Sequence, residues 1–173
     1  MTEPYWIAGP WTGRLAISAR PRGGEWLDEE MFSWRRLGVH TVVSLLTADE
    51  EKDLDLEREG PVVGKSGMMF VSFPITDRSV PDSRLALTHL AAQLNADLAQ
   101  GKNVVIHCRQ GIGRAALVAA TVLLNQGREI EPVLLALSKV RGVPVPETPE
   151  QRAFLLRVSE DMGATAPSGS PRT

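Results

Sequence analysis

Short apolar segments alternate with helical patterns along most of the chain, and this alternation restricts the fold more than any other feature. The apolar segments occupy residues 5–7, 15–18, 39–46, 68–73 and 103–107. The segment at residues 39–46 is rich in β-branched residues and nearly continuously apolar, as a central buried strand is. Helical spacing of apolar residues occupies residues 25–37, 115–124, 131–140 and 149–162, and the stretch between Ser83 and Gly101. Such alternation predicts an α/β fold, a central mainly parallel sheet flanked by helices, with the first two strands as a hairpin at its edge.

The length and composition predict one ordinary globular domain. The chain has 173 residues, of which 43% are hydrophobic and 23% charged. We expect a single domain over residues 1–162 and a flexible, small-residue tail over residues 163–173. No stretch approaches the roughly 18 apolar residues of a membrane helix, and no secretory signal opens the chain. We therefore expect a cytoplasmic protein without a membrane span. We also expect a monomer.

Charge and cysteine content exclude several classes of function. The formal net charge of −2 provides no basic field, which argues against a nucleic-acid binder. The acidic stretch of residues 49–59 is interpreted as the solvated face of a helix. The chain has a single cysteine, Cys108, which excludes an internal disulfide. It has only three histidines in addition, too few for us to expect a cysteine and histidine zinc site.

The segment from His107 to Arg114 carries the clearest chemical signal. It lies between an apolar strand and a helix, where α/β folds place ligands. Gly111 and Gly113 allow a tight turn whose amides form a nest for an anion. The same field and a nearby arginine stabilise a thiolate at Cys108. Arg114 can bind two phosphate oxygens, so the segment predicts a cysteine nucleophile that attacks a phosphoryl group.

Such an attack also needs an acid to protonate the leaving oxygen. Asp77 is the candidate, because its loop follows the strand at residues 68–73 and reaches the same sheet edge as Cys108. Asp82 is the competitor, although its position before a helix favours a capping role.

These residues resemble the cysteine-dependent protein phosphatases, whose signature H-C-x5-R is matched by His107, Cys108 and Arg114. Asp77 lies 31 positions before Cys108, as in the dual-specificity branch. The loop around Asp77 is similar to that of cyclin-dependent-kinase-associated phosphatases and related bacterial tyrosine phosphatases. Residues 147–151 resemble the family's Q-T-x-x-Q loop.

The resemblance implies a phosphocysteine mechanism that requires no metal or other cofactor. In it, Cys108 attacks, Arg114 and the loop amides bind the phosphoryl oxygens, and Asp77 serves first as acid and then as base for water. His107 would order the loop and support the thiolate. The loop residues that would contact substrate are Arg109, Gln110, Gly111, Ile112, Gly113 and Arg114.

The chain departs from the family at two positions. Ala115 stands where a serine or threonine hydroxyl usually helps the thiolate to leave, so hydrolysis of the phosphoenzyme could be slow. Glu147 replaces the first Gln of the Q-T-x-x-Q loop and could order water or repel phosphate. Gln151 is the supporting pocket residue carried over from that loop, or else a plain surface residue.

The sequence therefore predicts a phosphatase that acts on phosphotyrosine, and on phosphoserine or phosphothreonine, in proteins. A phosphoinositide or a small phosphomonoester stays open as the substrate. A sulfurtransferase loop is one residue shorter than residues 109–113. The G-x-G-x-x-A pattern after Gln110 lacks the following strand of a dinucleotide site. The remaining alternative is a phosphate-reading module with weak turnover, which Ala115 favours.

Overall fold

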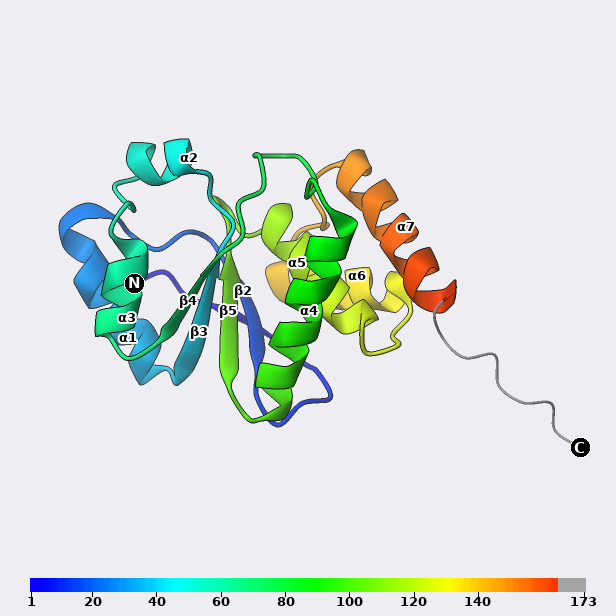
Figure 1. The fold of residues 1–173 in the computed structure, drawn as a ribbon, viewed down its shortest axis with the longest axis horizontal. Coiled ribbons are helices and arrows are strands. Elements are labelled where there is room, and N and C mark those ends of the chain that lie inside the picture. Colours follow the sequence, from blue (N-terminus) through cyan, green and yellow to red (C-terminus); the bar gives the residue numbers. More distant parts are fainter. Residues whose placement is uncertain (165–173) are drawn as a thin grey trace, which may run out of the picture.

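The computed structural model describes residues 1–164 of the chain, and within them five strands form one sheet in the order β1-β2-β5-β3-β4. The strands are β1 (Tyr5–Ile7), β2 (Leu15–Ser18), β3 (Val39–Ser44), β4 (Met69–Ser72) and β5 (Asn103–His107). Only β1 is antiparallel to its neighbour, and the other pairs are parallel. The predicted α/β fold is confirmed, with β1 at one edge and β5 at the centre, and Figure 1 shows β5 between β2 and β3.

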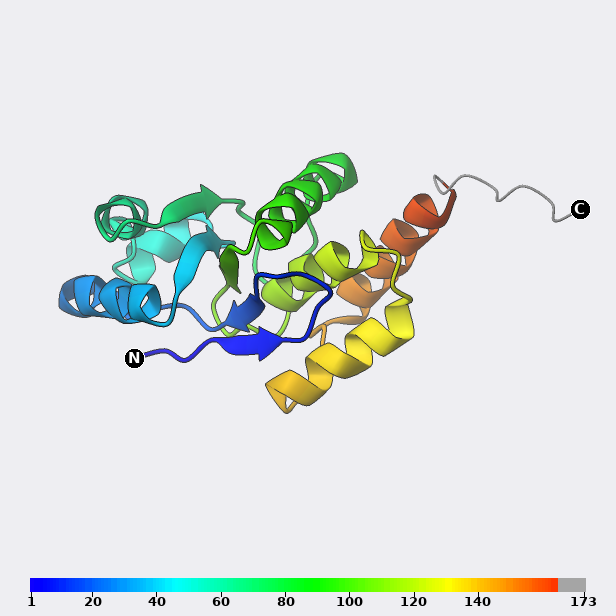
Figure 2. The same cartoon turned by 90° about the horizontal axis from the view of Figure 1, so that it is seen from below.

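Two groups of helices cover the sheet. The first comprises α1 (Leu27–Arg36), α2 (Ala48–Asp53) and α3 (Glu59–Lys65), with a short 3-10 turn (Gly24–Trp26) before α1. The second comprises α4 (Arg84–Ala99), α5 (Arg114–Leu124), α6 (Ile130–Arg141) and α7 (Pro149–Ala164). Figure 2 shows the two groups on opposite sides of the strands. The central strands β2, β3 and β5 are thus buried on both faces, as their near-continuous apolar sequences predict. The prediction of a buried strand at residues 68–73 is wrong, because β4 is an edge strand whose residues are exposed or half-buried.

Each group of helices packs on its own hydrophobic core. Along β5, Val104 and Ile106 join the core beneath α4–α7, whereas Val105 joins the core beneath α1 and α3. Successive side chains of a strand point to opposite faces of the sheet, so β5 contributes to both cores. Trp34 of α1 is buried in the second core.

Helix α5 lies at the centre of the larger core. Every residue from Arg114 to Leu124 is buried, and the helix packs against α4, α6 and α7. The helix therefore has no face toward solvent, as its continuous apolar sequence predicts. Because it is packed on all sides, its N-terminus is held in place at the end of β5. That placement positions the loop between β5 and α5.

The interpretation of residues 49–59 as a solvated helical face is wrong for two of its acids. The segment contains α2 and the start of α3, and both Glu50 and Glu59 are buried. A high density of acidic residues predicts that their side chains are exposed only where no basic side chain is available to pair with them. Here the partners come from distant parts of the chain, which a local pattern does not contain.

The last helix ends slightly later in the structure than the sequence predicts. Helix α7 continues to Ala164, beyond the predicted end at residue 162. The rest of the predicted tail, residues 165–173, lies outside the described residues. Within residues 1–164, no helix combines the length and the apolar character needed to cross a membrane.

Candidate active site

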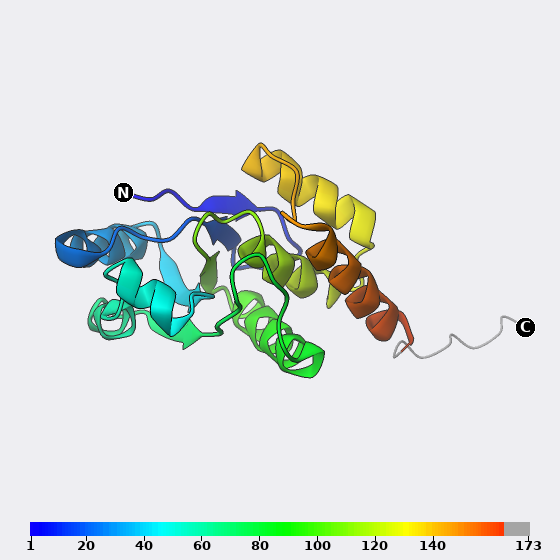
Figure 3. The same cartoon turned by 90° about the horizontal axis from the view of Figure 1, so that it is seen from above.

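Three segments converge at the carboxyl ends of the parallel strands. They are the β5–α5 loop, the β4–α4 loop and α2, and Figure 3 looks onto this end of the sheet. Hydrogen bonds join them, because Arg114 at the start of α5 contacts Glu50 of α2 and Asp77 of the β4–α4 loop. The predicted nucleophile, arginine and acid therefore share one sheet edge.

Cys108 follows β5 directly and lies 3% exposed at the base of its loop. Its Sγ accepts a hydrogen bond from the amide of Gly111 at 3.2 Å. Gly111 has a φ of +72°, and a Cβ there would lie 2.5 Å from the carbonyl of Ser18. Only glycine fits this position, so the amide that faces the sulfur depends on Gly111.

The remaining loop amides are free to bind an anion. Within residues 1–164, the backbone amides of residues 109, 110, 112, 113 and 114 find no hydrogen-bond acceptor. A tight turn of free N–H groups ahead of a helix N-terminus is a typical anion-binding arrangement. The loop therefore offers donors of the kind that the predicted phosphate nest requires.

Arg114 is 1% exposed and is held by five hydrogen bonds. Its Nη1 donates to Glu50 Oε2 at 2.7 Å and its Nη2 to Glu50 Oε1 at 2.8 Å, a paired contact. Nη1 also donates to the carbonyls of Leu45 and Ile75. Nη2 donates to Asp77 Oδ1 at 2.8 Å, while Nε is not engaged by any of these partners.

The charges around Arg114 keep it cationic. Burial lowers the pKa of its guanidinium, but the hydrogen bond with Glu50 and the charges of Cys108, Glu50 and Asp77 outweigh burial, so the pKa is raised. For Glu50, burial raises the pKa, and the contacts with Arg114 and Thr47 lower it further than burial raises it. The two side chains therefore form a charged pair that fixes the arginine.

The predicted substrate-contacting residues meet in a pocket of about 180 Å³. Its lining comprises Asp77, Arg78, Cys108, Arg109, Gln110, Ile112, Gly113, Arg114 and Glu147. Gly111 lies behind this lining, against Ser18. The structure thus brings together the predicted nucleophile, acid and arginine.

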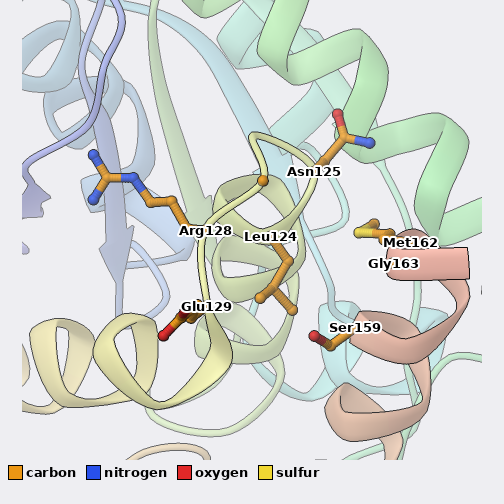
Figure 4. Close-up of a pocket in the computed structure, with 8 residues that line it drawn as sticks. Leu124, Asn125, Arg128, Glu129, Ser159, Met162 and Gly163 are labelled. Carbon is orange, nitrogen blue, oxygen red and sulfur yellow. The ribbon is translucent and has the colours of Figure 1, made fainter. Parts of the chain in front are cut away.

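A larger cavity of about 500 Å³ lies away from this site, between the C-terminal end of α5, the start of α6 and the end of α7 (Figure 4). Leu124, Arg128 and Ser159 are among its lining residues. Its lining contains neither the cysteine nor the buried arginine. Size alone therefore does not identify the reactive site.

Two contacts tie the Asp77 loop to the start of α7. Arg78, at a φ of +58°, donates from Nη1 to Glu147 Oε1 at 2.6 Å. Gln151 donates from Nε2 to the carbonyl of Ser79 at 3.0 Å. Gln151 is fully buried, so its interpretation as a plain surface residue is wrong. It supports the loop from behind Gly113 and does not line the pocket.

The competing acid lies elsewhere. Helix α4 is capped by Ser83, whose hydroxyl accepts from the amide of Ala86 at 3.1 Å. Asp82 is exposed and does not line the pocket. Of the two carboxylates, Asp77 is the one within reach of Arg114.

Sequence reasoning missed two residues that hold the loop. Glu50 was assigned to a solvated face, but it binds Arg114. Arg141, at the end of α6, donates to the carbonyls of Gln110 and Gly111 at 2.9 and 3.1 Å, and its guanidinium lies over the ring of Tyr5. A basic residue in the last turn of a helix is common, so the sequence held no specific signal for this contact.

His107 lies buried beneath the loop, with Nε2 2.8 Å from Oε1 of Glu59. Ala115 is also fully buried, at the start of α5. Among residues 1–164, no cluster of histidine, cysteine and carboxylate side chains is arranged to hold a metal ion.

Comparison with known families and proteins agrees with this geometry. The family model described as "Polymorphic toxin system, DSP-PTPase phosphatase" (Tc-R-P) matches residues 18–128, which include Asp77, Cys108 and Arg114. A curated relative is "Putative tyrosine phosphatase 197R" of Invertebrate iridescent virus 6, 27% identical over 125 residues. The match covers 70% of this chain and 45% of that protein, so the chain spans less than half of the relative's length.

Solved structures share the fold. Kinase-associated phosphatase (KAP), with its catalytic cysteine changed to serine, matches with a TM-score of 0.85 and 20% identity, over 94% of this chain and 97% of that one. Tk-PTP in its active form matches with a TM-score of 0.76 and 26% identity, over 91% and 96% of the two chains.

Proposed function

This chain belongs to the Tc-R-P family of DSP-PTPase phosphatases, and from that premise we propose that it removes phosphate from phosphotyrosine and from phosphoserine or phosphothreonine in proteins. One observation carries the proposal. The Sγ of Cys108 faces the amide of Gly111 in the pocket where Asp77 and Arg114 are joined at 2.8 Å. A nucleophile, an anion site and an acid are thus within one small space.

The first step transfers the phosphoryl group to sulfur. The loop amides and Arg114 bind the oxygens of the phosphoryl group and hold phosphorus against the Cys108 thiolate. The S–P bond forms as the P–O bond to the leaving group breaks. Asp77 gives its proton to the departing oxygen, which leaves as an alcohol or phenol.

The second step regenerates the enzyme. Asp77, now ionised, takes a proton from a water molecule that attacks phosphorus. The new P–O bond forms as the S–P bond breaks, and the thiolate of Cys108 leaves. Inorganic phosphate is released, and Asp77 again holds a proton.

The size of the pocket supports action on both classes of phosphoamino acid. A pocket of about 180 Å³ has room for a phosphate and the first atoms of its ester, and little more. Arg78, Arg109 and Gln110 at its mouth are polar, so they can accept a peptide chain on either side of the phosphoryl group. A longer phosphotyrosine and a shorter phosphothreonine then differ mainly in how far the peptide stands from the loop.

A matched substrate panel tests this proposal. Two peptides of one sequence, carrying phosphotyrosine or phosphothreonine, are compared with a soluble short-chain phosphoinositide, each in the presence of a chelator. We expect Cys108-dependent phosphate release from both peptides, and none with Cys108→Ser. Release from the phosphoinositide alone would contradict protein substrates.

Glu147 and Ala115 favour a second candidate, a phosphate-reading module. Glu147 brings a negative charge to a pocket for an anion, and Ala115 offers no hydroxyl near the sulfur. If the folded protein binds phosphopeptide by calorimetry but releases no phosphate in the same panel, the reading function replaces the enzymatic one.

A further inference from the structure

A buried pair of titratable side chains lies beneath the catalytic loop, and the proposed reaction does not use it. Glu59, the first residue of α3, is 1% exposed, and His107, the last residue of β5, is fully buried. Oε1 of Glu59 and Nε2 of His107 are 2.8 Å apart, at ion-pair distance but without hydrogen-bond alignment. Within residues 1–164, neither side chain has a hydrogen-bond partner.

A buried carboxylate without hydrogen bonds is costly unless a proton or a cation neutralises it. The imidazole of His107 is the group at ion-pair distance from Glu59. A protonated imidazole supplies that cation in direct contact with the carboxylate.

The neighbours of the pair favour a charged His107. In the chain, His107 is followed directly by Cys108, and a cation beside a cysteine stabilises its thiolate form. The hydroxyls of Ser18 and Ser44, in register with His107 on the adjacent strands, are buried and have no partner among the described residues. They add two buried hydroxyl groups beside the pair.

Other groups face the pair from the neighbouring helices. From α1, the ring of Trp34 lies 6.2 Å from the His107 ring. From α2, Glu51 is close enough to interact. Burial raises the pKa of Glu51, the negative charge of Glu59 raises it further, and the charge of His107 opposes both. Within residues 1–164, Glu59 and Glu51 therefore act on His107 from the neighbouring helices, and Cys108 follows it in the chain.

We propose that Glu59 is a positioning residue: it keeps His107 protonated and fixed beneath the loop, and thereby favours the thiolate of Cys108. The carboxylate contacts Nε2 at 2.8 Å, and His107 directly precedes Cys108 in the chain, so a cationic His107 places a positive charge next to the residue that carries the thiolate. This inference rests on the proposed role of Cys108 as nucleophile.

The test measures the thiolate directly. The rate of Cys108 alkylation by iodoacetamide is followed as a function of pH for the wild-type protein and for Glu59→Gln. The substitution keeps the shape of the side chain but removes its charge, so His107 becomes neutral. We expect the midpoint of the alkylation profile to rise by about one pH unit, which slows alkylation about tenfold below the midpoint.

A matched control removes a buried carboxylate elsewhere. Glu30 of α1 is fully buried and contacts Thr2 and Arg22, away from the loop. Glu30→Gln should leave the midpoint at its wild-type value. An equal rise in Glu30→Gln, or no rise in folded Glu59→Gln, would overturn the proposal.

A double-mutant cycle separates positioning from simple structural support. In a His107→Asn background, Glu59→Gln should cause no upward shift, because the group that it acts through is gone. The same upward shift in that background would overturn the proposal. If Glu59→Gln does not fold, Glu59→Asp replaces it, since the shorter chain withdraws the carboxylate from Nε2 and should shift the midpoint in the same direction.

Alkylation does not depend on turnover. A protein that hydrolyses no phosphopeptide but shows the shift contradicts the proposed function and keeps this inference. A protein that hydrolyses phosphopeptide but shows no shift in the alkylation midpoint supports the proposed function and contradicts this inference.

Discussion

Asp77 Oδ1 and Arg114 Nη2 are 2.8 Å apart, so the candidate acid is bound to the candidate phosphate-binding arginine. Arg114 is almost fully buried and fixed by Glu50, whereas Asp77 is about half exposed. The arginine is thus the rigid partner, and the aspartate is the one that can move. A phosphoryl group that binds Nη2 would displace Asp77 and leave its carboxyl free to hold a proton.

The first prediction concerns this carboxyl group. Asp77→Asn removes the proton donor, so hydrolysis of esters with poor leaving groups should fall by about 100-fold or more. Esters with good leaving groups need little protonation and should be affected much less. The measurement is kcat/KM, which reports the first chemical step, for phosphotyrosine peptide against p-nitrophenyl phosphate.

The matched control is Asp82→Asn, which changes an exposed carboxylate outside the pocket in the same loop. Its effect on both esters should be small. Equal slowing of the two esters by Asp77→Asn would show that Asp77 acts in some other way.

The second prediction concerns Ala115. Its side chain is fully buried at the start of α5, directly after Arg114, and carries no hydroxyl. Ala115→Ser should accelerate the departure of the thiolate from phosphocysteine, because a hydroxyl can donate a hydrogen bond to the sulfur. In stopped-flow traces, the slow phase after the burst should become several-fold faster while the burst itself is unchanged. An unchanged slow phase means that another group already assists the sulfur.

The third prediction concerns Glu147. Its carboxylate lies at the pocket, where Oε1 binds Arg78 and Oε2 is 2.9 Å from where a Cβ on Gly113 would stand. A negative charge there repels a phosphate dianion. Glu147→Gln should therefore lower the inhibition constant for inorganic phosphate several-fold, and the effect should shrink at high salt. A higher inhibition constant would mean that Glu147 helps the anion through Arg78.

The fourth prediction concerns Glu50 and acid. Contacts with Arg114 and Thr47 place the pKa of Glu50 below its ordinary value of 4.5, despite the opposing effect of burial. A carboxyl group with a lowered folded-state pKa stabilises the fold above its unfolded pKa, and this stabilisation is lost as the pH falls through the folded value. The wild-type protein should therefore lose stability below pH 4.5 more steeply than Glu50→Gln.

Denaturant unfolding between pH 7 and pH 3 checks this difference. At pH 7, Glu50→Gln should lower the free energy of unfolding by about 3 kcal/mol, because it leaves the charge of Arg114 poorly compensated. Asp49→Asn, an exposed neighbour in α2, is the control and should be nearly neutral. Parallel pH profiles for wild type and Glu50→Gln would contradict the account of this pair.

The sequence predicted the sheet and the reactive loop because both depend on local patterns. Strand β5 and helix α5 are continuous apolar segments, and Gly111 has a conformation that other residues rarely adopt. The segment from Cys108 to Arg114 is then the loop that connects this strand to this helix. These features need no knowledge of the rest of the chain.

The supports of the site could not be predicted in this way. Glu50 and Glu59 look like members of one acidic run, yet each is buried against a residue about fifty or more positions later. Arg141 reaches the loop only because α6 ends beside it. Such contacts depend on how helices pack on the sheet, and a single sequence contains no local mark of them.

The most direct test of the account is the identity of the phosphorylated residue. Wild-type protein is mixed with p-nitrophenyl phosphate under a chelator, quenched in acid during the burst, digested and analysed by mass spectrometry. The account predicts one phosphoryl group on the peptide that contains Cys108, formed at the rate of the burst and absent from Cys108→Ser. Hydrolysis that proceeds with no phosphoryl group on Cys108, or with one on another residue, would contradict it.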